Sequence, residues 1–486
     1  MRIIGNDPST PRQAQIVASG TLSTGDAVIV NADGTVSVVS EPITTSLSSG
    51  TPVVFEAAST YYTACGYDAN AQKIVIAYRD DGNSSRGTAV VGTVSGTSIS
   101  FGTPVVFETG AAYPESVVYD SNSQKVVITY PDYGNSGYGT AVVGTVSGTS
   151  ISFGTPVVFE SANTTGPRAV FDSSAQKIVI AYTDGGNSSY GTAIVGTVSG
   201  TSISFGSPTV YETANSYFKS IAYDANASKV VIAYADLGNS TYGTAIVGTV
   251  SGTSISFGTA AIFNGSGSSY YSSIAYDANA QKVVVFYQDG SNSNYGTANV
   301  GTVSGTSISF GAKVVFSSSN MQVPAATYAP NSQQTVVVFK DSGDSNKGKV
   351  AAGTISGTSI SFSSPLTFQD SSSDFFGVAY DASTERVVAS YNDSGNSIYG
   401  TSCVILTRTA VTNLTTENYI GTAATGAPSG KGAKINLKGA VDENQSGLTA
   451  GQSYYVQADG TLGTTPAEPS VFAGTAVAAT KLIVKG

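Results

Sequence analysis

The sequence predicts an all-β protein: a seven-bladed β-propeller inserted into a small β-barrel or sandwich that both termini form. Three observations predict it. Seven near-copies of a unit of roughly 52 residues fill the middle of the chain, each copy contains four strand-like segments, and the two flanks of the repeats match each other. A repeat of this length with four strands is typical of a propeller blade. The expected parts are 1–45, 46–407 and 408–486.

The copies align on an aromatic residue that an aspartate follows in all but the sixth copy, where alanine takes its place. The aromatic residues are Tyr67, Tyr119, Phe171, Tyr223, Tyr276, Tyr328 and Tyr380. Their spacing is 52 residues, stretched to 53 once. We number the repeats 1 to 7 in this order.

Repeat 1 contains the segments TACGYD, KIVIAY, GTAVVGTV and SISFGTPVVFE, separated by Gly, Asn, Asp and Ser residues that favour turns. The second segment is apolar at nearly every position, which is expected when neighbouring blades cover both of its faces. The fourth carries Pro52, Pro104, Pro156, Pro208 and Pro365 in different copies, and Lys313 in one. Pro and Lys favour edge strands, so this segment is predicted to be one outer-rim strand.

The last repeat ends after its third segment, at 400–407, and no fourth segment follows. Residues 46–56 (SLSSGTPVVFE), which precede the first complete repeat, align without gaps with the missing rim strand. We therefore expect this amino-terminal strand to complete the blade begun by the carboxy-terminal repeat. Residues near 45 and 408 would then lie side by side.

The flanks form a duplicated β module. The segment LSTGDAVIVNADGTV from Leu22 aligns with LTAGQSYYVQADGTL from Leu448, YIGTA with FAGTA, and KINLKG with KLIVKG. Nine residues join two of these segments in the second copy, whereas the same connection in the first copy holds all seven repeats. An inserted domain needs adjacent ends, which the rim strand supplies. The flanks are therefore predicted to be one base domain.

Composition excludes several classes of function. The chain has no histidine, so Ser-His-Asp, Cys-His and His-based zinc sites are impossible. A net charge of −10 without a Lys/Arg cluster argues against nucleic-acid binding. The amino terminus lacks the apolar core of a secretory signal, and no apolar stretch is long enough to insert into a membrane. Cys65 and Cys403 are expected to be isolated small residues of the interior rather than a disulfide.

The flanking pattern GDAVIVNADGTV, GLTAGQSYYVQADGTL and VFAGTAVAATKLIVKG resembles β-rich modules of tailed-bacteriophage virion proteins, of the capsid-decoration and fibre types. The resemblance implies a protein that is made in the host cytoplasm and becomes part of the virion as a homo-oligomer. Its base would dock on other virion proteins of capsid or tail. The repeats also resemble degenerate Asp-box repeats of sialidase-like propellers. Here the box has lost its Asp and Trp, and a phenylalanine such as Phe101 takes the aromatic place.

Two further patterns in the sequence concern catalysis and metal binding. The resemblance to sialidases implies an arginine triad, but of seven arginines only Arg168 begins an inner strand, so we expect no enzyme. An aspartate also recurs after every second segment: Asp80, Asp132, Asp184, Asp236, Asp289, Asp341 and Asp393. Spaced carboxylates could bind calcium, but repetition in every copy favours a turn-nucleating role. No metal or other cofactor is therefore predicted.

The repeats differ most in the link between the rim strand and the next inner strand, which is expected at the mouth of the central channel. The candidate ligand-binding residues there are Tyr62, Tyr113, Glu115, Arg168, Phe218, Lys219, Tyr271 and Phe376. Such aromatic side chains suit stacking on sugar rings or contact with protein. The alternative is that they plug the channel or fill blade junctions.

The sequence thus favours a non-enzymatic virion structural protein whose base docks on the particle and whose propeller is displayed for decoration or adhesion to the host surface. The alternative is a carbohydrate-binding module of a tail fibre that recognises host-surface glycans. A glycan-degrading enzyme is the third hypothesis.

Overall fold

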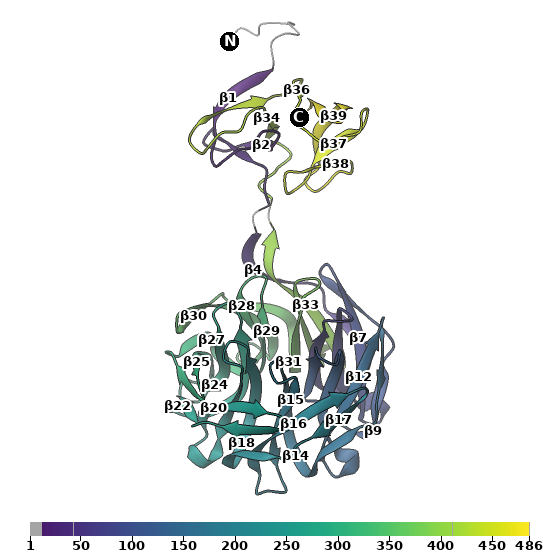
Figure 1. Cartoon of the computed structure of the whole chain (residues 1–486), viewed down its shortest axis with the longest axis vertical. Helices are drawn as coiled ribbons and strands as arrows, with labels where there is room; N and C mark the ends of the chain where they lie inside the picture. Colours follow the sequence, from purple (N-terminus) through teal and green to yellow (C-terminus); the bar gives the residue numbers. More distant parts are fainter. Residues whose placement is uncertain (1–11, 42, 411, 486) are drawn as a thin grey trace. The chain divides into compact units, whose positions relative to one another are not determined.

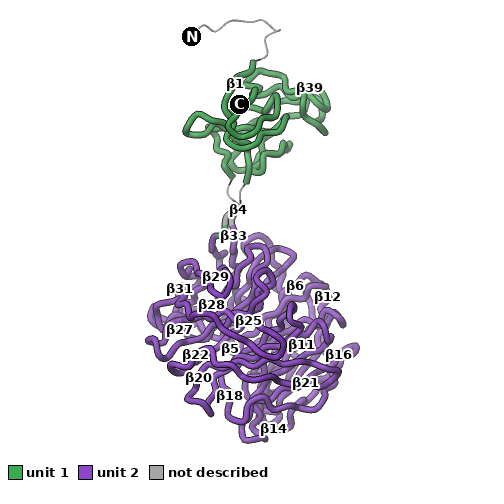
Figure 2. Tube along the Cα trace, turned by 60° about the vertical axis from the view of Figure 1, so that its left-hand side comes forward, with its two compact units in different colours: residues 1–45, 409–486 green, residues 46–408 purple. Residues whose placement is uncertain are grey.

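The computed structural model describes residues 12–485 except 42 and 411. The chain divides into two units, one of Ser46–Arg408 and one that combines Met1–Thr45 with Thr409–Gly486 (Figure 2). We call them the repeat unit and the terminal unit. The described residues form antiparallel strands and four short 3-10 turns, η1 (Asp81–Asn83), η2 (Tyr133–Asn135), η3 (Leu237–Asn239) and η4 (Ser394–Asn396). They include no helix with the length and apolar character of a membrane span.

Each repeat begins with an inner strand that pairs with a second strand (Figure 1). The inner strands are β5 (Val53–Asp68), β10 (Ser116–Asp120), β14 (Val157–Asp172), β18 (Thr209–Asp224), β23 (Ser269–Asp277), β27 (Val314–Ala329) and β31 (Leu366–Asp381). The second strands are β6 (Lys73–Asp80), β11 (Lys125–Asp132), β15 (Lys177–Asp184), β19 (Lys229–Asp236), β24 (Lys282–Asp289), β28 (Gln334–Asp341) and β32 (Arg386–Asp393). The aspartate that ends an inner strand fixes the turn between them, as when Asp68 accepts the N–H groups of Asn70 and Ala71, both at 2.9 Å.

The second strand of each repeat pairs with a third, and the third pairs with a short outer strand in repeats 1 to 6. The third strands are β7 (Arg86–Ser95), β12 (Tyr138–Ser147), β16 (Tyr190–Ser199), β20 (Tyr242–Ser251), β25 (Tyr295–Ser304), β29 (Lys347–Ser356) and β33 (Tyr399–Ala410). The short outer strands are β8 (Ser98–Phe101), β13 (Ser150–Phe153), β17 (Ser202–Phe205), β21 (Ser254–Phe257), β26 (Ser307–Phe310) and β30 (Ser359–Phe362).

The prediction of one continuous rim strand is wrong, because the chain breaks at the Gly-Thr-Pro segment. In repeat 2 the short β13 pairs with the last residues of β12, whereas β14 begins after Pro156 and pairs with the first residues of β12. The glycine of the break lies against the next repeat: a Cβ on Gly154 would lie 1.9 Å from the carbonyl oxygen of Thr201. Repeat 6 has Ser363 instead, and the repeat that follows it lacks the Ser-Gly-Thr turn. Glycine therefore occurs where a turn of the neighbouring repeat needs the space.

The strand that follows the break serves two repeats at once. The first part of β14 pairs with β12 of repeat 2, and its second part pairs with β15 of repeat 3. Five such strands are 16 residues long. In two places the strand is interrupted, giving β9 (Val105–Ala111) before β10 and β22 (Ala261–Asn264) before β23. Pro114, which has no N–H to donate, lies in the first gap, and the one-residue insertion of repeat 5 lies in the second.

The predicted pairing of the amino-terminal segment with the last repeat is present. Strand β4 (Ile43–Ser49) and the first part of β5 both pair with β33, with Val53 opposite Ser402 and Glu56 opposite Gly400. Figure 1 shows β4 beside β33. Residues nearly 350 positions apart therefore share one sheet.

The core of the repeat unit lies between the sheets of neighbouring repeats. Residues 74–78 of β6 are fully buried, as the sequence predicts. Ile74, Ile76 and Tyr78 pack against repeat 7, whereas Val75 and Ala77 pack against repeat 2. Cys65 and Cys403 are both free thiols, as expected; Cys403 is buried and Cys65 is half-buried. Burial on both faces explains why the second strand carries no polar alternation.

The terminal unit contains two five-stranded sheets of the same order. The first is β1 (Gln13–Val17), β35 (Gly432–Asn436), β34 (Tyr419–Ala423), β2 (Ala27–Val30) and β3 (Val36–Val38). The second is β36 (Val441–Asp442), β40 (Lys481–Val484), β39 (Val471–Ala478), β37 (Ser453–Val456) and β38 (Leu462–Gly463). The segments that match in sequence occupy matching places, and residues of both sheets share one apolar cluster.

Candidate functional site

Most inner strands contain a two-residue bulge at the same position. The register of β5 with β6 slips between Tyr61 and Ala64, and matching slips occur in repeats 3 to 7. We call the residues at this position the mouth ring; they are 62–63, 114–115, 166–167, 218–219, 271–272, 323–324 and 375–376. The first bulge residue has φ of 52° at Tyr62, 48° at Phe218 and 51° at Tyr271. This left-handed conformation costs a non-glycine residue about 1–2 kcal/mol, and such strain concentrates at functional sites.

The mouth ring surrounds a cavity of about 110 Å³ to which all seven repeats contribute. A second cavity of about 210 Å³, lined by the following inner-strand residues of every repeat, shares Thr63, Glu115, Arg168, Ser272, Pro324 and Phe376 with the first. The inner strands therefore enclose a central channel, and the bulges form its opening.

Seven of the eight predicted ligand-binding residues line the smaller cavity: Tyr62, Glu115, Arg168, Phe218, Lys219, Tyr271 and Phe376. The eighth, Tyr113, stacks on Tyr62 with ring centroids 4.4 Å apart and planes at 15°. Phe376 is only 9% exposed and packs on Phe368 and Tyr391, so most of its surface fills the junction between strands. The sequence left open whether these residues contact a ligand or fill the junctions between blades. The first interpretation fits residues such as Tyr62, and the second fits Phe376.

Aromatic rings continue outward from Tyr62. Phe375 lies 4.7 Å from Tyr62 and Tyr133 lies 4.4 Å from Tyr113, measured between ring centroids. The guanidinium of Arg79 lies 4.6 Å from the centroid of the Tyr113 ring, within cation–π range. Tyr133 is 44% exposed, so this aromatic group reaches solvent.

Sequence reasoning missed Arg79 and Tyr133, because Arg79 lies within the second strand and Tyr133 lies in the turn after it, whereas the search covered the link after the rim strand. A signal was present. The residue before the recurring aspartate is Arg79, Pro131, Thr183, Ala235, Gln288, Lys340 or Asn392, so it differs in every repeat. In repeat 1 this position pairs with Tyr61, next to the mouth ring. Two variable positions of each repeat therefore meet on one face.

Three charged groups face one another across repeats 2 to 4. A terminal nitrogen of Arg168 lies 2.9 Å from Oε2 of Glu115, and another donates to the backbone oxygen of Glu115 at 2.5 Å. Lys219 is 5% exposed, and its ammonium donates to the backbone oxygen of Thr165 at 3.1 Å. Burial lowers the pKa of Lys219 to about 7; Glu115 opposes this shift and Arg168 adds to it. The charge of this cluster therefore changes near neutral pH.

Side chains of the second bulge position also tie neighbouring repeats together. The hydroxyl of Thr63 donates to the backbone oxygen of Phe375, and the hydroxyl of Ser272 donates to that of Phe218. Lys219 makes the corresponding contact with Thr165. Its amine thus has a structural partner as well as a place in the cavity wall.

The recurring aspartates lie outside both cavities. Most of them act as turn caps: Oδ1 of Asp132 accepts the N–H of Asn135 at 3.1 Å, and Oδ1 of Asp184 accepts that of Gly186 at 2.9 Å. The turn-nucleating role predicted for these aspartates is therefore the one observed. Between residues 12 and 485, no group of three or more Asp, Glu or Cys side chains is arranged to hold a metal ion.

Comparison with solved structures bears on the fold. The chain is similar to the BP39L lectin from Burkholderia pseudomallei, with a TM-score of 0.54 and 11% identity over 74% of this chain and 99% of that one. The repeats form a β-propeller. AofleA from Arthrobotrys oligospora (TM-score 0.41, 11% identity, 72% of this chain and 96% of that one) and the sialidase of Trypanosoma rangeli (TM-score 0.41, 10% identity, 82% and 60%) also match. No protein-family model and no curated protein matches the sequence.

Proposed function

We propose that the protein binds glycans, without altering them chemically, at the mouth of its propeller. The observation that carries this proposal is the mouth ring, in which aromatic rings and hydrogen-bonding groups from neighbouring repeats surround one opening. Sugars present apolar faces and rims of hydroxyl groups, which such a surface complements. The backbone strain at Tyr62, Phe218 and Tyr271 supports the proposal, since it holds three aromatic side chains in the cavity wall.

The proposal includes the architecture that displays this site. We assign one blade to each repeat, which makes seven, and we assign the closure of the ring to β4 and β5 on β33. The regular register of every repeat and the pairing of Val53 with Ser402 support this assignment. The terminal unit would be the base that holds the propeller in place.

A second candidate function is decoration of a bacteriophage virion. The duplicated sheets of the terminal unit favour it, because a module with the propeller in one connection is suited to attachment through one part and display of the other. In this case the base would dock on capsid or tail proteins, with the protein as a homo-oligomer on the particle. Electron microscopy of purified particles tests this candidate, which fails if no density corresponds to the propeller.

Glycan binding is tested with the full chain on a glycan array, followed by calorimetric titration of the sugars retained. We expect Phe218→Ala and Tyr62→Ala to weaken binding about tenfold each, because a stacking contact contributes about 1 kcal/mol beyond its buried area. Tyr223→Ala is the matched control, since Tyr223 lies on β18 with Phe218 but outside both cavities.

Two results would contradict the proposal. The first is that the intact protein retains no glycan on the array. The second is that the control substitution Tyr223→Ala weakens binding as much as Phe218→Ala. Release of free sugar during incubation with host polysaccharides would contradict binding without catalysis.

A further inference from the structure

In repeats 1 to 4 a glutamate lies beside the recurring aspartate, at a position separate from the mouth ring. The pairs are Glu56 with Asp80, Glu108 with Asp132, Glu160 with Asp184 and Glu212 with Asp236. In each repeat a buried tyrosine of the second strand donates its hydroxyl to the glutamate, at 2.9, 3.2, 3.1 and 3.0 Å respectively. The four aspartates are 7–8% exposed. Each pair therefore places two carboxyl groups and a phenol oxygen in a largely buried site between two strands.

These carboxyl pairs lack compensating charge within the described chain, since none of the eight groups belongs to an ion pair there. Burial, and then the neighbouring Glu56, raise the pKa of Asp80; burial and Glu108 do the same for Asp132. The backbone N–H groups of Asn83 and Gly82 act in the opposite direction and lower the pKa of Asp80, but they do not outweigh burial and Glu56. A buried pair of like charges is costly unless a cation or a proton neutralises it.

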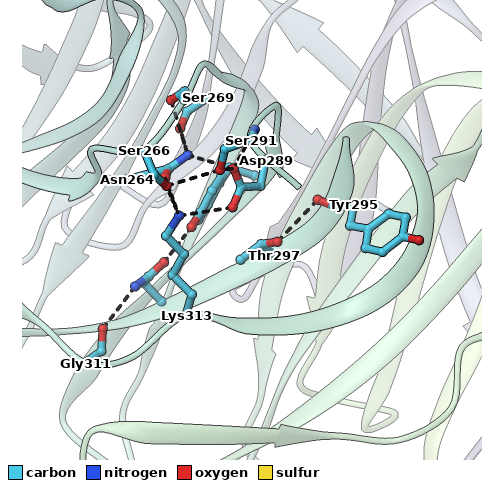
Figure 3. Close-up of polar contacts among 12 residues, drawn as sticks. Asn264, Ser266, Ser269, Asp289, Ser291, Tyr295, Thr297, Gly311 and Lys313 are labelled. Atoms are coloured by element: carbon cyan, nitrogen blue, oxygen red, sulfur yellow. Dashed lines mark hydrogen bonds and ion pairs between the residues drawn. The ribbon is translucent and has the colours of Figure 1, made fainter. Parts of the chain in front are cut away.

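Repeat 5 shows what occupies this place when the glutamate is missing. Asn264 replaces the glutamate, and Lys313 stands at a position that is proline in five of the seven copies. The ammonium of Lys313 donates to Oδ1 of Asn264, to the hydroxyl of Ser266 at 2.7 Å and to Oδ2 of Asp289 at 3.1 Å (Figure 3). One cationic nitrogen therefore contacts the glutamate-equivalent and aspartate positions together.

The pKa of Asp289 reflects this cation. Burial acts to raise it, but the hydrogen bonds from Ser291 and Lys313 outweigh burial, so the pKa is lowered. The shift is opposite in direction to that of Asp80 and Asp132. The same carboxylate position is thus stabilised in its charged form where a serine hydroxyl and a lysine ammonium both donate to it.

In repeat 6 a lysine on a different strand contacts the recurring aspartate. Ser317 replaces the glutamate, and Lys349 on β29 replaces the threonine found there in the other repeats. Its ammonium lies 2.7 Å from Oδ2 of Asp341 and 2.8 Å from Oδ2 of Asp344. Repeat 7 has neutral Gln369, which accepts the hydroxyl of Tyr391 at 3.0 Å. Two separate substitutions thus bring a lysine to the aspartate where the glutamate is absent.

We propose that the four Glu–Asp–Tyr sites of repeats 1 to 4 each bind one hard divalent cation such as Ca²⁺, and that Lys313 and Lys349 replace this cation in repeats 5 and 6. The donors are oxygen atoms only, which calcium prefers, and water would complete the shell. With two carboxylates per site the affinity belongs to the weak range of calcium modules, a Kd of about 10⁻⁴–10⁻³ M. Each cation would join the strand arriving from one repeat to the second strand of the next.

The test is calorimetric titration of CaCl₂ into the full chain after removal of metals with a chelator. We expect about four equivalent sites and a calcium-dependent rise in the melting temperature, with Mg²⁺ at equal ionic strength much less effective. The variant with Glu56, Glu108, Glu160 and Glu212 all changed to Gln should lose both effects. The double variant Glu108→Ser/Thr140→Lys copies repeat 6 and should stay folded while binding three ions instead of four.

Absence of saturable uptake up to ~10 mM calcium would overturn the proposal, as would uptake that the four glutamine substitutions leave unchanged. The competing explanation is a proton shared within each pair. It predicts that the four-glutamine variant melts higher than the parent while calcium affects neither protein. Circular dichroism of each variant shows whether lost binding reflects lost fold.

Discussion

Replacing Lys219 with glutamine should change how the stability of the propeller depends on pH. Lys219 is 5% exposed, and burial lowers its pKa from an ordinary 10.5 to about 7. Between these values the unfolded chain keeps the proton that the folded chain has released. Because the unfolded state binds more protons there, the free energy of unfolding of the parent protein rises as pH rises above 7. Glutamine retains a donor for the backbone oxygen of Thr165 but does not titrate.

The size of the effect follows from the pKa shift. One pKa unit corresponds to 1.36 kcal/mol, so between pH 7.5 and 9.5 the parent should gain roughly 2.5 kcal/mol that the variant does not. A unit of roughly 360 residues unfolds with an entropy of about 0.76 kcal/mol/K. The difference in melting temperature between parent and variant should therefore change by about 3 °C over this range.

The assay is differential scanning calorimetry of both full-length proteins at several pH values. Lys229→Gln is the control, because Lys229 begins the neighbouring strand β19 and lies outside the cavity. Its melting temperature should follow the parent at every pH. If the curve for Lys219→Gln runs parallel to that of the parent, the lysine is charged in the folded protein and the reasoning from burial is refuted.

Four further substitutions test the packing of the repeats. Gly154→Ala should lower the melting temperature by several degrees because its Cβ would meet a backbone oxygen of the next repeat, whereas Ser363→Gly should leave it almost unchanged; equal effects would show that the break needs glycine for another reason. Lys313→Met should destabilise the propeller by about 1–3 kcal/mol in chemical denaturation, since it removes the cation from buried Asp289, which keeps its hydrogen bonds from Ser291, and a neutral outcome would contradict the ion pair. Glu108→Gln should raise the melting temperature in chelator at pH 7.5 but hardly at pH 4, because raised carboxyl pKa values cost stability as pH rises through them; a rise of the same size at both pH values would contradict this.

Much of the architecture could be predicted from the sequence because its signals are local and repeated. The apolar run of residues 74–78 identified a strand covered on both faces, and the gapless match of residues 46–56 to the rim segment identified its partner β33. The split of the rim strand could not be predicted in this way. It depends on contact between Gly154 and a turn of the next repeat, which the sequence of a single repeat does not describe.

The position of the candidate site could be predicted from the sequence, but not all of its residues could. Disagreement between repeats located Tyr62, Lys219 and their neighbours, which line one cavity. The left-handed bulge that orients Tyr62 leaves no local signal, since aromatic residues rarely adopt positive φ. Tyr133 was missed because it lies in a turn that forms in the same way in the repeats, and only the exposed residue of that turn varies.

The 16-residue strands of the propeller affect how it unfolds. Because β14 is the outer strand of repeat 2 and the inner strand of repeat 3, these two repeats cannot separate without breaking the hydrogen bonds of a shared strand, and the same holds wherever the strand is continuous. The unit that was duplicated in the sequence is thus not the unit that can unfold. Amide hydrogen exchange should then be protected to a similar depth wherever the shared strand is continuous, and opening should begin at the two interruptions, before β10 and before β23.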